Sequence, residues 1–175
     1  VIQRLPDSIC AICSFSVGFD HIDLDAAKAR GIIVTNPPEV LSDATAEIAM
    51  LLLLGAARRA YEGQQQIRTE TWADWSATYQ LGIQVTGKRL GILGAGRVGQ
   101  IMAKRARGFD MEIHYYNRNR LPADVEAGAI YHESVEDLLP HCDFLSIHCP
   151  ATPETHHLIN AERIALLPDG AIVVN

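Results

Sequence analysis

The fold of this chain is indicated most clearly by the residues Leu90-Gly91-Ile92-Leu93-Gly94-Ala95-Gly96-Arg97-Val98-Gly99. It begins in an apolar run, residues 88–93, which predicts a short buried strand. It then enters residues 97–107, where apolar side chains recur at helical spacing. Gly108 follows, and glycine at that position favours the end of a helix. A glycine-rich turn therefore joins a strand directly to a helix.

The turn has the pattern G-x-G-x-x-G, formed by Gly94, Gly96 and Gly99. After a strand and before a helix, the first glycine permits a tight turn and the second lets the backbone approach a pyrophosphate. The third glycine lets the helix pack close to the strand. The helix N-terminus adds unpaired N–H groups and a partial positive charge. We predict that these glycines bind a dinucleotide; the alternative is a turn that binds no ligand.

The next diagnostic position follows the predicted strand 111–116. NAD sites usually carry an acidic residue there, which binds the ribose 2′-OH. This chain instead reads Asn117-Arg118-Asn119-Arg120, with two arginines and no acid. A carboxylate would repel a 2′-phosphate, whereas a guanidinium binds one through paired hydrogen bonds. We predict that Arg118 and Arg120 bind the cofactor, with NADP favoured over NAD; the alternative is that both are solvated loop charges.

The rest of the chain alternates strands with helices, which is typical of an α/β protein with a doubly wound parallel sheet covered on both faces. Further strands are predicted over 111–116, 142–148 and 170–174. The first 40 residues differ, because two short strands there flank one short helix. We predict a partial smaller domain over residues 1–41 and a dinucleotide-binding domain of Rossmann type over residues 42–175.

A long helix is predicted at the start of the second domain, capped by Ser42 or Asp43 and running to about Ala60. It is apolar nearly all round, which is typical of a helix buried on most sides, often between domains or subunits. The polar residues 62–84 then form a long excursion before the strand of the glycine-rich turn.

Composition excludes several classes of function. The net charge of -6 argues against sequence-independent nucleic-acid binding, which needs a basic surface. The apolar run 48–54 is too short to cross a membrane, and no secretion signal opens the chain. Cys10 and Cys13 form a CxxC pair without a second pair to complete a metal site. We predict free, buried thiols, no bound metal and a cytoplasmic location.

Taken together, these segments resemble the D-isomer-specific 2-hydroxyacid dehydrogenases, in particular the glyoxylate and hydroxypyruvate reductases among them. The glycine-rich turn is one of five matching blocks, which follow the family's order and spacing over essentially the whole chain. The other four are Ser16–Asp23, Asn36–Pro38 with Asp43–Glu47, His148–Thr155 and Gly170–Asn175. The resemblance implies hydride transfer between a nicotinamide cofactor and a small 2-keto or 2-hydroxy acid. It also implies that the first domain is part of a flavodoxin-like substrate domain, and that the protein is a homodimer.

The resemblance also implies roles for individual residues. Backbone N–H groups of Val17 and Gly18 would bind the substrate carboxylate, as a turn of amides can; the other explanation for Gly18 is a positive φ. The residues implied on the cofactor are Thr45, Gly96, Arg97, Val98, Asn117, Arg118, Cys149 and Pro150. Trp72 and Trp75 would border a partner subunit's active site, or simply pack.

No catalytic residue is assigned within this chain. In the family, an Arg that orients the substrate follows the strand ending in Val174-Asn175, and a Glu and a His that act in proton transfer follow further on. We therefore expect the 175-residue polypeptide alone to have no turnover. His148 stands at the carboxyl end of a strand, but a structural role is favoured for it. Two alternatives to a reductase remain, a dinucleotide-sensing corepressor-like protein and an inactive fragment.

Overall fold

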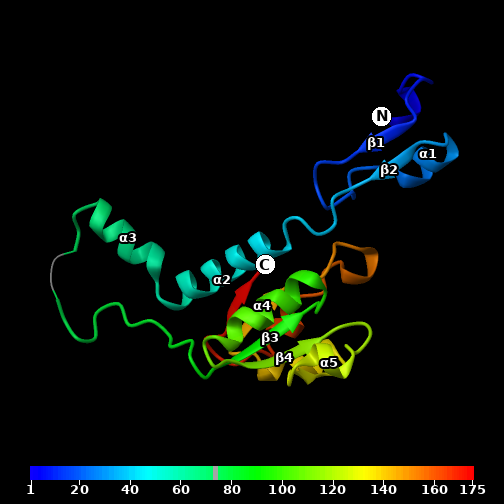
Figure 1. Cartoon of the computed structure of the whole chain (residues 1–175). Helices are drawn as coiled ribbons and strands as arrows, with labels where there is room; N and C mark the ends of the chain where they lie inside the picture. The colour runs from blue at the N-terminus through cyan, green and yellow to red at the C-terminus, as the bar shows by residue number, and fades with distance from the viewer. Residues whose placement is uncertain (73–74) are drawn as a thin grey trace. The chain divides into compact units, whose positions relative to one another are not determined.

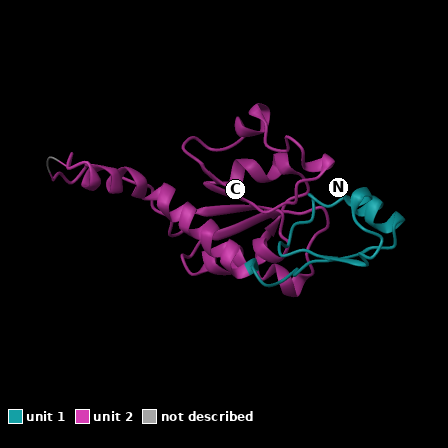
Figure 2. Ribbon diagram, turned by 90° about the horizontal axis from the view of Figure 1, so that it is seen from above, with its two compact units in different colours: residues 1–42 teal, residues 43–175 magenta. Residues whose placement is uncertain are grey.

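The computed structural model describes residues 1–72 and 75–175. These residues form two compact units, residues 1–42 and residues 43–175 (Figure 2). Each unit has its own parallel sheet and its own buried cluster.

Unit 1 is built on two short parallel strands, paired with Ala11 opposite Ile33. Its elements are η1 (Ile2–Arg4), β1 (Ala11–Cys13), α1 (Leu24–Ala29) and β2 (Ile33–Thr35). The Asp23 side chain begins α1 by accepting a hydrogen bond from the Ala26 N–H, as an N-cap residue does. The helix packs against the strands through a small core of Ile2, Ala27 and Ile32.

The cysteines of unit 1 differ from the sequence prediction. Cys10 and Cys13 are free thiols, but both are exposed rather than buried. The physical reason is the size of the sheet, because in its two strands only the middle residues, Ile12 and Val34, are partly buried. The residues on either side of them face solvent.

Unit 2 is organised around a five-stranded parallel sheet in the order β5-β4-β3-β6-β7. Figure 1 labels two adjacent strands of this sheet, β3 and β4. The strands are β3 (Arg89–Leu93), β4 (Glu112–Tyr116), β5 (Ile130–Tyr131), β6 (Phe144–Ile147) and β7 (Ile172–Val174). The chain passes from β3 to β4 on one side and returns to β6 on the other. In such sheets ligands bind at this reversal of strand order, beyond the carboxyl ends of the strands.

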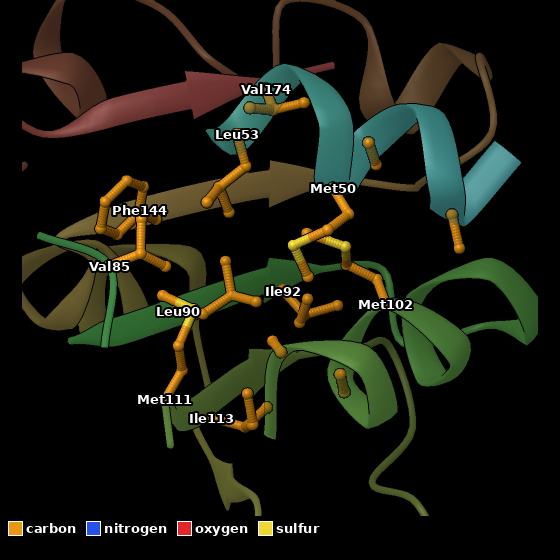
Figure 3. Packing of buried hydrophobic residues seen from close by; sticks show 14 of the residues in the cluster. Met50, Leu53, Val85, Leu90, Ile92, Met102, Met111, Ile113, Phe144 and Val174 are labelled. Carbon is orange, nitrogen blue, oxygen red and sulfur yellow. The ribbon is translucent and has the colours of Figure 1, made fainter. Parts of the chain in front are cut away.

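Helices cover both faces of this sheet, as predicted. The helices of unit 2 are α2 (Ser42–Ala57), α3 (Ala60–Arg68), α4 (Arg97–Arg107), α5 (Ala123–Glu126), α6 (Val135–Leu138) and α7 (Ala161–Ile164), with 3-10 turns η2 (Leu139–His141) and η3 (Pro153–Thr155). Of these, α3 has no buried residue and does not cover the sheet. On one face, Met50 of α2 and Met102 of α4 meet Ile92 of β3 (Figure 3). On the other, Leu138 of α6 packs against Leu93 of β3. Fully burying such a side chain contributes about 1.5–3 kcal/mol.

The long helix is shorter and more exposed than predicted. α2 ends at Ala57, because Arg59 adopts a left-handed φ of 54° and α3 begins at the next residue. One side of α2 is buried, but Leu51 on its other side is 63% exposed. The polar excursion also contains a helix, α3, which the sequence interpretation missed. The returning chain closes the base of the excursion, where the Ile83 N–H donates to the Ala57 carbonyl over 2.7 Å.

Candidate functional site

The predicted glycine-rich turn lies at the carboxyl edge of the sheet, immediately after the central strand β3. Gly94 has a φ of +94°, a conformation that L side chains rarely adopt. An added Cβ would also lie 2.7 Å from the Cys149 nitrogen and 2.9 Å from the His148 carbonyl carbon. The loop after β6 therefore runs against this turn, and glycine is needed at position 94 for both reasons.

The other two glycines of the motif stand in opposite surroundings. A Cβ at Gly99 would lie 2.3 Å from the Gly94 carbonyl oxygen, so this glycine lets α4 begin directly against the strand. A Cβ at Gly96 would meet nothing within 4 Å. Gly96 is also the N-cap of the 11-residue α4 and provides no side-chain cap. The first turn of α4, which includes Arg97 and Val98, thus begins at a backbone that is open to a ligand.

This arrangement fits the pyrophosphate of a dinucleotide. Four N–H groups at a helix start have no partner within the helix, and together with the helix dipole they favour an anion. The open space at Gly96 is the space that a side chain would fill and that a phosphate can occupy.

The end of β4 lies beside the same turn, because the Gly94 N–H donates to the Tyr116 carbonyl over 3.0 Å. Asn117 and Arg118 follow directly. The Asn117 amide donates to the Asn119 carbonyl over 3.1 Å, which holds the loop in a tight turn. Arg118 is exposed, and its charge helps to lower the pKa of Glu154, after the larger effect of a hydrogen bond with Thr152.

The second predicted arginine has a different position. The Arg120 guanidinium binds both carboxylate oxygens of Glu126, at 2.7 Å and 3.0 Å. Glu126 is a buried acid that the sequence interpretation missed. Its signal was weak, because it is six residues from Arg120 in a four-residue helix and belongs to no motif.

The loop after β6 also lies at the carboxyl edge of the sheet, beside the glycine-rich turn. The His148 N–H donates to the Leu93 carbonyl over 2.8 Å, which places the predicted Cys149 and Pro150 next to the turn. Burial raises the pKa of the half-buried Cys149 thiol, so the thiol is neutral near pH 7. The Pro150 carbonyl accepts a hydrogen bond from the Thr155 hydroxyl over 2.6 Å.

Two residues predicted on the substrate lie in unit 1, in the loop after β1. The Asn36 amide donates to the Val17 carbonyl over 2.7 Å, and the Ser16 hydroxyl donates to the Gly18 carbonyl over 2.8 Å. Gly18 is not among the glycines with positive φ, so the conformational explanation for it is wrong. Thr45, predicted on the cofactor, is exposed in the first turn of α2.

The His148 side chain contacts a hydroxyl of the strand that precedes it. Its Nε2 lies 2.8 Å from the Ser146 hydroxyl, and burial lowers its pKa. The structural role of His148 stays a prediction.

Three other histidines gather on the sheet face that carries α6. Nδ1 of the buried His114 lies 2.9 Å from Nε2 of His132, and Nε2 of His114 lies 2.6 Å from a carboxylate oxygen of Glu112. The His141 ring stacks on His114 with 5.2 Å between centroids. Burial first, and then the neighbouring His114 and His141, lower the pKa of His132, whereas Asp137 opposes the shift.

The histidine cluster predicts that stability falls in mild acid. The ordinary pKa of histidine is 6.5, and at pH values just below it the unfolded chain binds more protons at position 132 than the folded chain. Stability therefore decreases as the pH falls through 6.5, the ordinary pKa, toward the lowered pKa of His132 in the folded chain. We expect thermal unfolding to show a decrease of a few degrees in Tm, and His132→Gln to reduce that decrease. His21→Gln, in exposed surroundings, is the control, and an equal effect from it would contradict the assignment.

Within residues 1–72 and 75–175, no cluster of three or more His, Cys, Asp or Glu side chains is arranged to hold a metal ion. In the same part of the chain, no helix combines the length and hydropathy that crossing a membrane requires.

Comparison with known proteins identifies relatives of this chain. Residues 50–175 match the family described as D-isomer specific 2-hydroxyacid dehydrogenase, NAD binding domain. Glycerate dehydrogenase from Hyphomicrobium methylovorum is 51% identical over 100% of this chain and 55% of its own length. Glyoxylate reductase from Thermococcus litoralis is 46% identical over 94% of this chain and 51% of its own.

A solved structure agrees with these sequence relatives. The crystal structure of a glyoxylate reductase from Paecilomyes thermophila has a TM-score of 0.88 and 40% identity, covering 99% of this chain and 52% of that one. The chain thus spans about half the length of the relatives it matches. The predicted fold class is confirmed, and the chain belongs to the D-isomer specific 2-hydroxyacid dehydrogenase family.

Proposed function

We propose that this chain is part of an oxidoreductase that interconverts small 2-keto acids, such as glyoxylate or hydroxypyruvate, with D-2-hydroxy acids, and that it prefers NADP to NAD. Residues 42–175 would form the dinucleotide-binding domain, and residues 1–41 would be part of the substrate domain. Support for the reaction comes from relatives named glycerate dehydrogenase and glyoxylate reductase.

One observation carries the preference for NADP. Where an acid would bind the 2′-OH of NAD, the loop beside the glycine-rich turn carries Asn117 and the exposed Arg118. Among the described residues, Arg118 makes no ion pair within 4.0 Å. Its guanidinium is thus available to a 2′-phosphate, for which its planar donors are well matched.

The residues of the chain would bind and orient rather than react. The N–H groups that begin α4 would hold the pyrophosphate, Asn117 and Arg118 the adenosine ribose with its phosphate, and Cys149 and Pro150 the adenine side. The bound cofactor supplies the hydride. Backbone N–H groups of Val17 and Gly18 would hold the substrate carboxylate. No residue of the chain is assigned to proton transfer.

A steady-state assay tests this proposal. We expect the 175-residue chain alone to have no turnover. We expect a protein that joins this chain to the family's Arg, Glu and His to oxidise NADPH with glyoxylate or hydroxypyruvate, with a kcat/KM at least about tenfold higher for NADPH than for NADH. A charge-assisted hydrogen bond to the 2′-phosphate contributes about 1.5–3 kcal/mol, and about 1.4 kcal/mol is a tenfold change. Equal or better use of NADH would contradict the preference. If the protein that carries the family's Arg, Glu and His binds NADPH saturably but turns over neither keto acid, the nucleotide-sensing alternative is favoured.

We also propose a homodimer, supported by the apolar side of α2 that solvent reaches in the single chain. Ile48, Leu51 and Leu52 are exposed there. Light scattering should give twice the chain mass for the wild type and the monomer mass for Leu51→Glu. Ile164→Glu, on the exposed side of α7, should leave the mass unchanged; a monomeric wild type would contradict the proposal.

We further propose a reducing, cytoplasmic location, which the four free thiols support.

A further inference from the structure

The loop between β4 and α5 is attached at both ends. At its start, the Tyr116 carbonyl accepts from the Gly94 N–H of the glycine-rich turn. At its end, the Leu121 N–H donates to the Tyr115 hydroxyl over 3.1 Å, which ties the end of the loop back to β4. Residues 117–120 lie between these points, so their conformation depends on both of them.

A buried carboxylate organises the second attachment. Glu126 is only 8% exposed, and it accepts hydrogen bonds from the Tyr115 hydroxyl and, on both oxygens, from Arg120. The Arg120 hydrogen bonds and then the Tyr115 hydrogen bond lower the pKa of Glu126 to about 2, so it is charged at neutral pH. Bidentate pairing of this kind fixes direction as well as distance.

Further contacts hold the two partners in place. Arg107, in the last turn of α4, donates to the Glu126 carbonyl over 2.9 Å. The Arg120 guanidinium also lies over the Tyr131 ring, 5.6 Å from its centroid. The charge of Arg120 is therefore used within the protein, whereas the charge of Arg118 faces solvent.

We propose that Tyr115, Arg120 and Glu126 form a clamp that holds residues 117–119 in the conformation that presents Arg118 to the 2′-phosphate of NADP. Arg120 and Glu126 are then positioning residues that determine the choice between NADP and NAD, and neither touches the nucleotide. This inference rests on the proposed function.

One substitution distinguishes the clamp from direct binding of the 2′-phosphate by Arg120, because the two predict opposite changes in NADP⁺ affinity. Glu126→Gln removes the charge that holds Arg120 and keeps the side-chain size. If Arg120 were a phosphate ligand restrained by Glu126, its release would increase the affinity for NADP⁺. If the clamp positions Arg118, the same change weakens NADP⁺ binding, by about tenfold for a loss near 1.4 kcal/mol, and leaves NAD⁺ binding within about twofold.

The experiment is calorimetric titration of the protein with NADP⁺ and with NAD⁺ at one ionic strength. In an Arg118→Ala background, Glu126→Gln should cause no further loss of NADP⁺ affinity, because the clamp acts through Arg118. The matched control is Glu136→Gln, which removes the Arg163–Glu136 ion pair elsewhere in unit 2 and should change neither affinity. If Glu126→Gln unfolds the protein, Tyr115→Phe takes its place as the test. This change removes only the hydroxyl, and it should also lower the affinity for NADP⁺ relative to the affinity for NAD⁺.

The outcomes distinguish this inference from the function on which it rests. A wild type that binds neither dinucleotide overturns both. A wild type that prefers NADP⁺, together with a Glu126→Gln variant whose NADP⁺ affinity is unchanged or higher, overturns the clamp alone. Equal loss of NADP⁺ and NAD⁺ affinity would also overturn it, because a general structural role predicts that result.

Discussion

Gly96→Val is expected to abolish most dinucleotide binding while leaving the protein folded. The Cβ at position 96 would enter open space, with no atom within 4 Å, so the folded state loses no packing. The φ of Gly96 is -73°, so the left-handed conformation that requires glycine is not present there. The new side chain would occupy the space in which we place the pyrophosphate, and keep it from the N–H groups that begin α4.

The expected loss of affinity is large. Hydrogen bonds to charged groups contribute about 1.5–3 kcal/mol each, so losing about 3 kcal/mol lowers affinity by roughly 100-fold. Titration with NADPH measures this loss, and thermal unfolding should show a Tm close to that of the wild type. Unchanged affinity in a folded variant would place the dinucleotide elsewhere.

Gly99→Ala is expected to lower the stability of the fold, whereas Gly96→Val is expected to lower the affinity for the dinucleotide. The added Cβ at position 99 would lie 2.3 Å from the Gly94 carbonyl oxygen and 3.0 Å from Cγ2 of Ile92. The first of these atoms belongs to the backbone of the turn and cannot rotate away, so α4 must move from β3. Overpacking of this kind costs typically about 1–3 kcal/mol. It outweighs the roughly 0.5–1 kcal/mol by which alanine favours a helix over glycine.

Thermal unfolding is the measurement for Gly99→Ala. At about 2–4 °C of Tm for each kcal/mol in a domain of this size, the variant should melt several degrees below the wild type. Gly55→Ala is the matched control, since Gly55 lies in α2 with nothing within 4 Å of an added Cβ. It should be neutral or slightly stabilising. A Gly99→Ala variant as stable as Gly55→Ala would contradict the close packing of turn and helix.

The central part of the fold could be predicted because local signals and tertiary packing agree there. α4 spans Arg97–Arg107, as predicted, since glycines mark both its ends and its apolar residues keep one spacing. The central strands β3 and β6 are nearly continuous apolar runs, and the structure buries most of their residues. The same residues carry the turn that we propose as the nucleotide site.

The sequence failed where structure depends on distant contacts or on one backbone angle. α3 was missed because its residues are polar and its start depends on the left-handed φ of Arg59. β5 has only two residues, paired with β4, and offers no pattern of its own. The sequence does not predict which side of α2 is exposed, because apolar residues occur on all its sides. Only the position of the sheet decides which of them are buried.

The candidate site, like the fold, could be predicted from the sequence only in part. The turn and the start of the next loop follow from motif and chemistry. The position of Arg120 could not be predicted in this way. The residue that binds it, Glu126, lies beyond a turn, and only folding brings the pair together. An arginine in a loop has no sequence feature that separates a ligand for phosphate from a partner for a buried acid.

An equilibrium titration of the wild-type protein with NADPH and with NADH under the same conditions tests directly whether the glycine-rich turn binds a dinucleotide. We predict saturable binding of one dinucleotide per chain, at least about tenfold tighter for NADPH, as expected for one added charge-assisted contact. Equal affinity for the two would contradict the role of Arg118. Absence of saturable binding by either would contradict the central claim that the turn from Gly94 to Gly99 is a dinucleotide site.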